Sequence, residues 1–213
     1  MAELFFKYKD FYLNGLFVTL ALSLGAVLVG SIIGFVLSMM RLSKSLILGF
    51  LATAYVELIR GTPLMVQMFI AFFSLSPFKV PMFIIAFIAC ALNSGAYVCE
   101  IIRSGIQSVD KGQAEAGRSL GMSKKSVMKK IILPQAIKNI LPALCSEFVT
   151  VIKETSVAAM MGTKDLYYAG KAIGSSTYKH LDSLYIVGIM YFLVTFTLSK
   201  AIRMLERRLK QVD

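Results

Sequence analysis

The sequence predicts an all-α integral membrane protein, and three observations support that fold class. Hydrophobic residues make up 57% of the 213 residues, whereas soluble domains use about 45 to 50% apolar residues. A hydrocarbon core about 30 Å thick needs about 20 apolar residues in a spanning helix, and five segments are long enough: residues 16–40, 46–74, 82–102, 136–161 and 183–202. The stretch between the third and fourth of these segments, residues 104–135, is polar and basic. We therefore expect one domain over residues 1–213, with five transmembrane helices and a hairpin outside the membrane.

The first 40 residues predict an interfacial helix followed by the first span. In residues 1–14, apolar side chains recur at helical spacing with charged side chains between them, as in a helix that lies in the membrane interface. Within the first span, Gly30, Gly34 and Ser38 recur every four residues. Such a stripe of small residues allows a neighbouring helix to approach closely.

Charged residues and one proline mark the second and third spans. Glu57 precedes Arg60 by three residues, a spacing that allows an ion pair on one helix face. Glu100 and Arg103 repeat this spacing in the third span, so we expect two separate pairs that serve structure. Pro63 lacks a backbone donor and disfavours helical geometry at the residue before it, which predicts a kink or break in the second span.

The fourth span carries three charged residues in an otherwise apolar run. Glu147, Lys153 and Glu154 would each cost about 2.5 to 3.5 kcal/mol at a helix centre exposed to lipid, so they should face protein or water. The two carboxylates are seven residues apart and share one helix face, separated by about 10 Å, with Thr150 between them. Either they border a solute cavity while Lys153 pairs internally, or all three charges form a buried network that only holds helices together.

The distribution of basic residues predicts the orientation of the chain. Segments 41–45 and 103–138 and the tail from residue 200 carry fifteen Lys and Arg, whereas the loops on the other side carry six. Because positive charge collects on the cytoplasmic side, the N-terminus should be outside and the C-terminus inside. The net charge of +11 lies mostly beside spans, where topology and anionic lipids account for it, and this placement argues against nucleic acid as a partner.

No residue pattern points to catalysis or to a bound metal. The chain has no Gly-rich Walker loop and no Ser/His/Asp or Cys/His arrangement. Cys90, Cys99 and Cys145 lie within apolar segments without metal-ligand spacing, and His180 is the only histidine. We expect a protein that is not an enzyme and that holds no cofactor of its own. Any energy that its function requires must therefore come from another chain.

The polar stretch between the third and fourth spans predicts two short helices. Asp110 can cap the first, over residues 111–120, and Gly121 stands where a left-handed C-cap is needed. Ser123 can cap a second helix that ends near residue 132. The apolar side of this second helix consists of Val127, Met128, Ile131 and Ile132. Small residues keep the first helix slim, so it can enter a groove on a cytoplasmic partner.

Six motifs follow one another along the chain. They are Glu57-Leu-Ile-Arg-Gly-Thr-Pro63 with Gln67, Asn93-Ser-Gly-Ala-Tyr97 with Glu100 and Arg103, Gly105-Ile-Gln-Ser108, Gly112-Gln-Ala-Glu115, Ile-Leu-Pro-Gln-Ala136 and Lys153-Glu-Thr-Ser156. Together they resemble the polar amino-acid permease subunits of type I ATP-binding-cassette importers, over nearly the whole chain. One departure is Gly117, where that family more often has a second alanine. Glycine lowers helix propensity by about 1 kcal/mol, but it leaves the docking surface narrow.

The resemblance implies a permease that works with other chains in a bacterial plasma membrane. Two cytoplasmic ATPase subunits, which carry the ATP and Mg, would bind the hairpin. A second permease copy would complete the membrane pathway, and an extracytoplasmic binding protein would deliver the solute. Glu115 and Arg118 would make polar contacts with the ATPase, while Leu120 and the alanines would fill its groove. The residues implied in this coupling are Ala114, Glu115, Ala116, Gly117, Arg118, Leu120 and Gly121.

The implied solute is a polar amino acid. Its ammonium group needs an acceptor such as Glu147 or Glu154, and its carboxylate needs donors such as the Asn93 and Ser94 side chains. The candidate substrate-binding residues are Gln67, Asn93, Ser94, Glu147, Thr150 and Glu154. A second free carboxylate would suit a cationic side chain, as in arginine, lysine or histidine. A neutral amino acid such as glutamine and another small solute are the alternative solutes. An ion channel or ion-coupled carrier, and a structural or assembly subunit, are the alternative functions.

Overall fold

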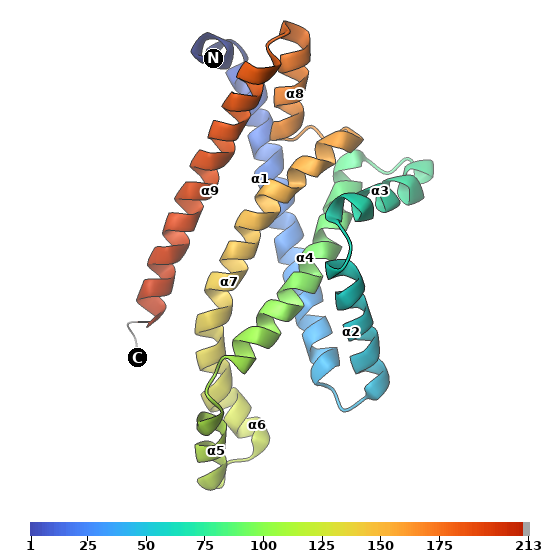
Figure 1. Cartoon of the computed structure of the whole chain (residues 1–213). Helices are drawn as coiled ribbons and strands as arrows, with labels where there is room; N and C mark the ends of the chain where they lie inside the picture. Colours follow the sequence, from blue (N-terminus) through green and yellow to red (C-terminus); the bar gives the residue numbers. More distant parts are fainter. Residues whose placement is uncertain (211–213) are drawn as a thin grey trace.

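The computed structural model describes residues 1–210, and these residues are all-helical, as predicted (Figure 1). The last three residues of the predicted domain, 211–213, lie outside the described residues. The helices are α1 (Ala2–Leu42), α2 (Leu46–Arg60), α3 (Leu64–Leu75), α4 (Met82–Gln107), α5 (Lys111–Ser119), α6 (Lys124–Val127), α7 (Leu133–Glu154), α8 (Leu166–Thr177) and α9 (His180–Lys210). Short 3-10 segments follow α3 and α7, at Ser76–Phe78 and Thr155–Met161, and a π-helical turn, Met128–Ile132, leads into α7.

A close contact between α1 and α4 forms the centre of the molecule (Figure 1). A Cβ atom added to Gly30 would lie only 2.9 Å from Cβ of Ser94. One added to Gly34 would lie 2.7 Å from Cβ of Val98. Residue numbers rise together along this contact, so the two helices run in the same direction. The predicted stripe of small residues is therefore confirmed as the surface that lets another helix approach.

The second predicted span is not one straight helix. α2 and α3 are bent by 104° at the break that separates them, and Pro63 is the residue that precedes α3. The predicted break at this proline is confirmed. The physical reason is that proline has no N–H to donate and disfavours helical geometry at Thr62. Figure 1 shows α3 turned across the bundle beside α4.

Three described helices, α1, α4 and α9, are long and apolar enough to cross a membrane, and the bent α2–α3 pair can count as a fourth span. α7 covers most of the fourth predicted span, which continues as the 3-10 segment Thr155–Met161, but α7 is not among the helices that are long and apolar enough. The count of five spans therefore stays a prediction. The helix expected over residues 1–14 is present as the start of α1, which has a kink at Tyr8; that it lies in the membrane interface stays a prediction.

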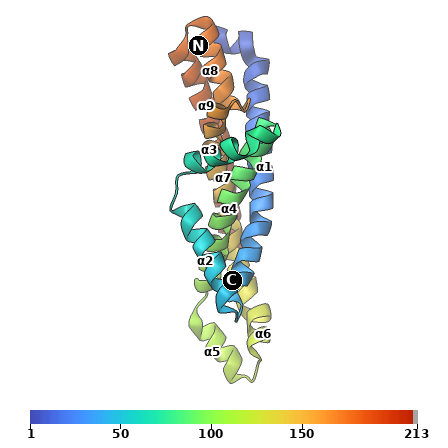
Figure 2. The ribbon, with the colours of Figure 1, turned by 90° about the vertical axis from the view of Figure 1, so that its right-hand side faces the viewer.

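The two ends of the bundle have different structures (Figure 2). α5 and α6 form the predicted hairpin at one end, while α8 packs against α1 and α9 toward the other. In the connection before α8, the Asp165 side chain is fully buried and accepts a hydrogen bond from the Tyr168 amide at 2.8 Å. Burial raises the pKa of this carboxyl to about 6. The hairpin end is thus polar and exposed, while the α8 end buries a titratable cap.

Candidate functional site

A buried serine and a buried glutamate meet where α4 packs against α7. The side chains of Ser94 and Glu147 are both buried, and the hydroxyl lies beside the carboxylate. The Ser94 hydroxyl nevertheless makes no hydrogen bond of normal geometry among the described residues. No cation within 4 Å pairs with Glu147 in the described part of the chain. A carboxylate inside a membrane domain without a fixed counter-charge is a candidate ligand group.

The second carboxylate of α7 lies on the same helix and near the first. Glu154 is half-buried at the last residue of α7, close enough to Glu147 for the two negative charges to interact. Thr150, between them, is half-buried and donates its hydroxyl to the Ser146 carbonyl at 3.2 Å. Lys153 is exposed and joins no ion pair within 4 Å among the described residues. The internal pairing expected for this lysine is therefore not found, because its side chain leaves the helix on another face.

Hydrogen bonds of the Gln67 and Asn93 side chains connect the break between α2 and α3 to α4. The Asn93 amide donates to the Gln67 side-chain oxygen at 3.0 Å. The Gln67 amide in turn donates to the Ile59 carbonyl at 2.7 Å and to the Thr62 hydroxyl at 2.9 Å. The polar atoms of Gln67 are thus engaged within the chain, and this residue orients Asn93 toward α3. Ser94, the next residue on α4, points instead toward α1 and α7.

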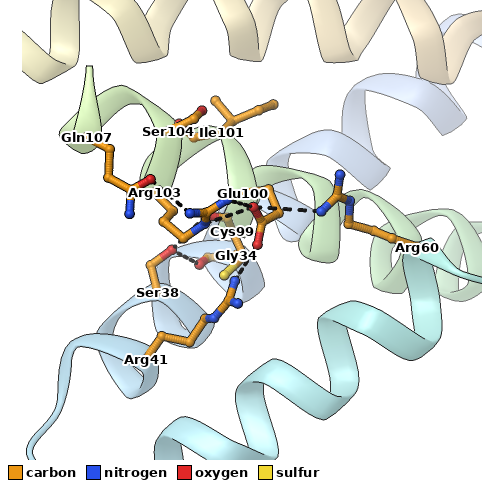
Figure 3. Close-up of polar contacts among 10 residues, drawn as sticks. All are labelled: Gly34, Ser38, Arg41, Arg60, Cys99, Glu100, Ile101, Arg103, Ser104 and Gln107. Atoms are coloured by element: carbon orange, nitrogen blue, oxygen red, sulfur yellow. Dashed lines mark hydrogen bonds and ion pairs between the residues drawn. The ribbon is translucent and has the colours of Figure 1, made fainter.

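An ion cluster that the sequence did not reveal joins α1, α2 and α4 (Figure 3). Glu100 is its centre. Arg41 donates to one oxygen of this carboxylate, and Arg103 donates to the other at 2.6 Å and 2.9 Å. Arg60 approaches the same carboxylate at 3.7 Å and covers the ring of Tyr97.

The expected pair between Glu100 and Arg103 is confirmed, but the expected pair between Glu57 and Arg60 is wrong. Among the described residues Glu57 forms no ion pair, since Arg60 turns toward α4. Arg41 was the missing member, and one signal could have found it. It follows Ser38 by three residues, so it continues the stripe of small residues that faces α4.

The hairpin has the caps that the sequence predicted. Asp110 accepts a hydrogen bond from the Gly112 amide at 2.6 Å, and Ser123 accepts one from the Ser126 amide at 3.2 Å. Gly121 has a φ of +80° between the two helices, a left-handed conformation that glycine adopts without strain. The second predicted helix is made of α6 and the π-helical turn. Its apolar side buries Val127 and Ile132, whereas Met128, also expected on that side, is exposed.

The two faces of α5 have different roles. Glu115, Ala116 and Arg118 are exposed, and Leu120, just past the helix, has 83% of its surface exposed. Gly117 is buried, and a Cβ atom there would lie 2.7 Å from Ile131. The expectation that Gly117 narrows a docking surface is therefore corrected: this glycine lets α5 pack against its own hairpin. Ala114 likewise packs against the hairpin core rather than projecting outward.

The hairpin is continuous with both helices that carry the buried polar residues. α4 enters it, and the π-helical turn Met128–Ile132 carries the chain directly into α7. Asn139 of α7 donates to the Ser108 hydroxyl at the end of α4, at 2.9 Å. A Cβ atom on Gly105 would clash with the Ile140 side chain, so α4 and α7 are in tight contact here. Displacement of the hairpin would therefore move α4 and α7 together.

The described residues thus form an all-helical domain with a buried carboxylate, that of Glu147, at the contact of α4 and α7, and an exposed hairpin at one end. Residues 26–211 match the model of a protein family described as binding-protein-dependent transport system inner membrane component. The chain belongs to this family, and its fold is the type I transmembrane fold of ATP-binding-cassette importers. The resemblance seen in the six sequence motifs is thereby confirmed.

Named relatives and a solved structure agree with this family. The arginine transport system permease protein ArtQ of Bacillus subtilis is 38% identical over 95% of this chain and 94% of its own length. A putative glutamine transport system permease protein GlnP of Rickettsia typhi is also 38% identical, over 93% of each chain. A crystal structure of an amino acid ABC transporter with histidines superposes with a TM-score of 0.92, at 43% identity over 95% of both chains.

Proposed function

We propose that this chain is the permease subunit of an ATP-driven importer for polar amino acids, and that its solute is a cationic amino acid. The observation that carries the proposal is the pair of carboxylates on α7. Glu147 is buried and Glu154 half-buried, and neither has a cation within 4 Å among the described residues. The names of the arginine permease and of the transporter with histidines support the same solute class.

The proposed solute contacts divide between α4 and α7. Glu147 accepts the α-ammonium group, with the Ser94 hydroxyl beside it, and Glu154 accepts the positive side chain. Asn93 supplies a donor for the solute carboxylate. Thr150 lies between the carboxylates and contributes its oxygen. Gln67 acts indirectly in this proposal, because its hydrogen bonds hold Asn93 in place.

The proposed mechanism couples these contacts to the hairpin. Closure of an ATPase pair on ATP pulls on the exposed face formed by Glu115, Ala116, Arg118 and Leu120. Because the hairpin joins α4 and α7 directly, the two helices rock together and turn the solute cavity from inward-facing to outward-facing. Ala114, Gly117 and Gly121 keep the hairpin rigid enough to transmit the movement. ATP and Mg act on the partner subunits, and this chain contributes no cofactor.

The proposed assembly contains two cytoplasmic ATPase subunits, a second copy of this permease and an extracytoplasmic solute-binding protein. It lies in the bacterial plasma membrane with the N-terminus outside and the C-terminus in the cytoplasm. This orientation places the basic hairpin on the side where ATP is available. The exposed Leu120 at the tip of the hairpin, together with the exposed Ala116, is the proposed apolar contact with a protein there.

Binding of a panel of amino acids to the purified permease with its ATPase tests the solute assignment. Arginine, glutamine and glutamate are titrated against the native chain, a Glu154→Gln variant and a Glu3→Gln control, which alters an exposed carboxylate far from α7. We expect selective arginine binding that is lost in Glu154→Gln and kept in the control. Equal binding of arginine by Glu154→Gln and the native chain would contradict the cationic assignment.

A neutral solute such as glutamine is the second candidate, because the glutamine-named relative is as similar as the arginine-named one. In that case glutamine binds in the same titration and arginine does not. Coupling is tested separately with the double change Glu115→Ala and Gly121→Ala, which should abolish ATP-driven uptake but leave amino-acid binding intact. Uptake at the native rate in that variant, or solute flux without ATP, would contradict the importer mechanism and favour a channel or ion-coupled carrier.

A further inference from the structure

The cluster around Glu100 contains more positive charge than it neutralises. Three guanidinium groups, those of Arg41, Arg60 and Arg103, surround one carboxylate, so two positive charges lack a partner in the cluster. The Arg41 side chain is only 19% exposed. Removing a charge from water is costly unless an opposite charge accompanies it. The cluster therefore has a deficit of negative charge.

A cavity of about 230 Å³ adjoins the cluster and lies between α1 and α4. Its polar lining consists of Ser38, Arg41, Arg103 and Gln107, and Arg103 donates to the Gln107 side-chain oxygen at 2.8 Å. Arg41 uses one terminal nitrogen on Glu100, and a guanidinium group has five N–H donors, so further donors are available to a ligand. An anionic group in this cavity would sit beside two arginines and would supply the missing negative charge.

Apolar side chains form the other part of the same cavity's lining. They are those of Leu42, Ile102 and Ile106. Leu42 also ends an exposed apolar stripe on α1 that includes Phe35 and Met39, with exposed fractions of 55% and 42%. In a membrane protein such a stripe faces acyl chains. The cavity thus joins a basic pocket to a lipid-facing surface.

From this juxtaposition we propose that the cavity between α1 and α4 binds the phosphate group of an anionic phospholipid. The phosphate lies between Arg41 and Arg103, which bind phosphate oxygens through charge-assisted hydrogen bonds. The glycerol and the start of an acyl chain follow the apolar lining formed by Leu42, Ile102 and Ile106. Basic pockets between membrane helices on the cytoplasmic side recognise anionic headgroups in this way. The inference does not depend on which solute the protein transports.

The surroundings favour a lipid over an acidic side chain of a partner protein. The pocket is recessed between two helices and opens beside the apolar stripe, whereas the surfaces suited to protein docking lie on the projecting hairpin, at Glu115 and Leu120. A free phosphate would satisfy the arginines but would leave the apolar lining uncovered. Only a phospholipid matches both parts of the lining.

Native mass spectrometry of the full-length permease in detergent, titrated with short-chain phosphatidylglycerol, tests the proposal. Phosphatidylcholine with the same chains is the neutral comparison. Arg41→Gln should bind phosphatidylglycerol about tenfold more weakly, the loss expected for one charge-assisted hydrogen bond. Lys44→Gln, which removes a nearby charge outside the cavity, should bind like the native chain. Arg41→Lys should keep part of the affinity because it keeps the charge.

Glu100→Gln adds a test with the opposite sign. This change removes the negative charge from the cluster, so phosphatidylglycerol should bind more tightly than to the native chain. A variant that merely unfolds would lose binding instead, and size-exclusion profiles identify such a loss. Affinities for phosphatidylglycerol that are equal in Arg41→Gln and the native chain, or equally reduced in Lys44→Gln, would overturn the proposal.

Two further titrations distinguish the sources of the anion. Inorganic phosphate at millimolar concentration should not displace phosphatidylglycerol, and full displacement would assign the pocket to free phosphate instead. Binding of the ATPase subunit should be the same for Arg41→Gln and the native permease. If that change weakens ATPase binding and leaves lipid binding unaltered, the pocket accepts an acidic group of the partner and the lipid assignment is wrong.

Discussion

Glu100 and Glu147 are both carboxylates inside the membrane domain, yet their surroundings are opposite. Glu100 on α4 has three arginines around it and hydrogen bonds to both of its oxygens. Glu147 on α7 has a serine and a second carboxylate near it, and no arginine or lysine within 4 Å in the described chain. A charge compensated within the fold can hold helices together, whereas an uncompensated one is free to pair with a ligand, the role that we propose for Glu147. The contrast suggests a structural role for Glu100 and, as proposed above, a solute-binding role for Glu147.

The largest expected effect is on transport. Changing Glu147→Gln should lower ATP-driven uptake of arginine about 100-fold, because a charge-assisted contact to an ammonium group contributes about 1.5 to 3 kcal/mol. Thermal stability should be unchanged or higher, since a buried charge is removed. Uptake in proteoliposomes and a melting curve measure both quantities. Near-native uptake, or a large loss of stability, would place Glu147 in the same class as Glu100.

The converse change, Glu100→Gln, should act on stability. Because three arginines then lose their common partner, the free energy of unfolding should fall by about 1 to 3 kcal/mol. The loss is smaller than for a fully buried ion pair because Arg60 and Arg103 are partly exposed to solvent. The melting temperature of the purified permease is the measurement. Asp182→Asn on α9 serves as the control for loss of a carboxylate. An unchanged melting temperature would mean that the ion cluster does not hold α1, α2 and α4 together.

A glycine-to-alanine change on α1 tests how the cluster is assembled. Gly34→Ala would place a Cβ atom 2.8 Å from the backbone nitrogen of Cys99, so α1 must move away from α4. Such overpacking costs about 1 to 3 kcal/mol and should weaken the contact of Arg41 with Glu100. Gly49→Ala, on α2, meets no atom within 4 Å and is the matched control. Equal stability of the two variants would show that α1 and α4 are not closely packed at Gly34.

A third buried carboxyl, that of Asp165, should give a smaller effect that depends on pH. Burial raises its pKa in the folded chain to about 6 from the ordinary value of 3.8. The folded state therefore holds the proton more tightly than the unfolded state, so this stabilisation is complete below the ordinary pKa of 3.8 and is lost as the pH rises through about 6. Raising the pH from about 5 to about 7.5 should cost about 1 kcal/mol.

Melting curves of the native chain and of Asp165→Asn at both pH values measure this effect. Asparagine keeps an oxygen that can cap α8 and cannot ionise, so the variant should lose less stability than the native chain over the same pH range. Identical pH dependence of the two proteins would mean that Asp165 does not titrate as a buried group.

Local features of the chain were predictable because they depend on neighbours in sequence. The break at Pro63, the caps at Asp110 and Ser123 and the left-handed turn at Gly121 each follow from the backbone chemistry of one residue and its next few neighbours. The stripe of small residues on α1 belongs to the same class, since helical periodicity alone places its members on one face. The hairpin that carries the family resemblance was therefore visible from the start.

Partners that lie far apart in sequence were not predictable in this way. A spacing of three residues suggested that Arg60 pairs with Glu57. Arg60 instead approaches Glu100, 40 positions away, and Arg41 pairs with the same carboxylate from 59 positions away. Gly117 was expected to face a partner and is buried against Ile131 instead. Each choice depends on which helix faces pack together, and helical periodicity does not specify that.

The sequence by itself determined that this protein is a helical membrane protein with a polar hairpin, because hydrophobic length and local caps act over a few residues or through composition, and its six ordered motifs were enough to show the resemblance to amino-acid permeases. Only the tertiary structure decided which buried charges are neutralised and which stay available. The reason is electrostatic: the cost of burying a carboxylate depends on the distance to a counter-charge, and that distance is set by the packing of α1 and α4 for Glu100 and of α4 and α7 for Glu147.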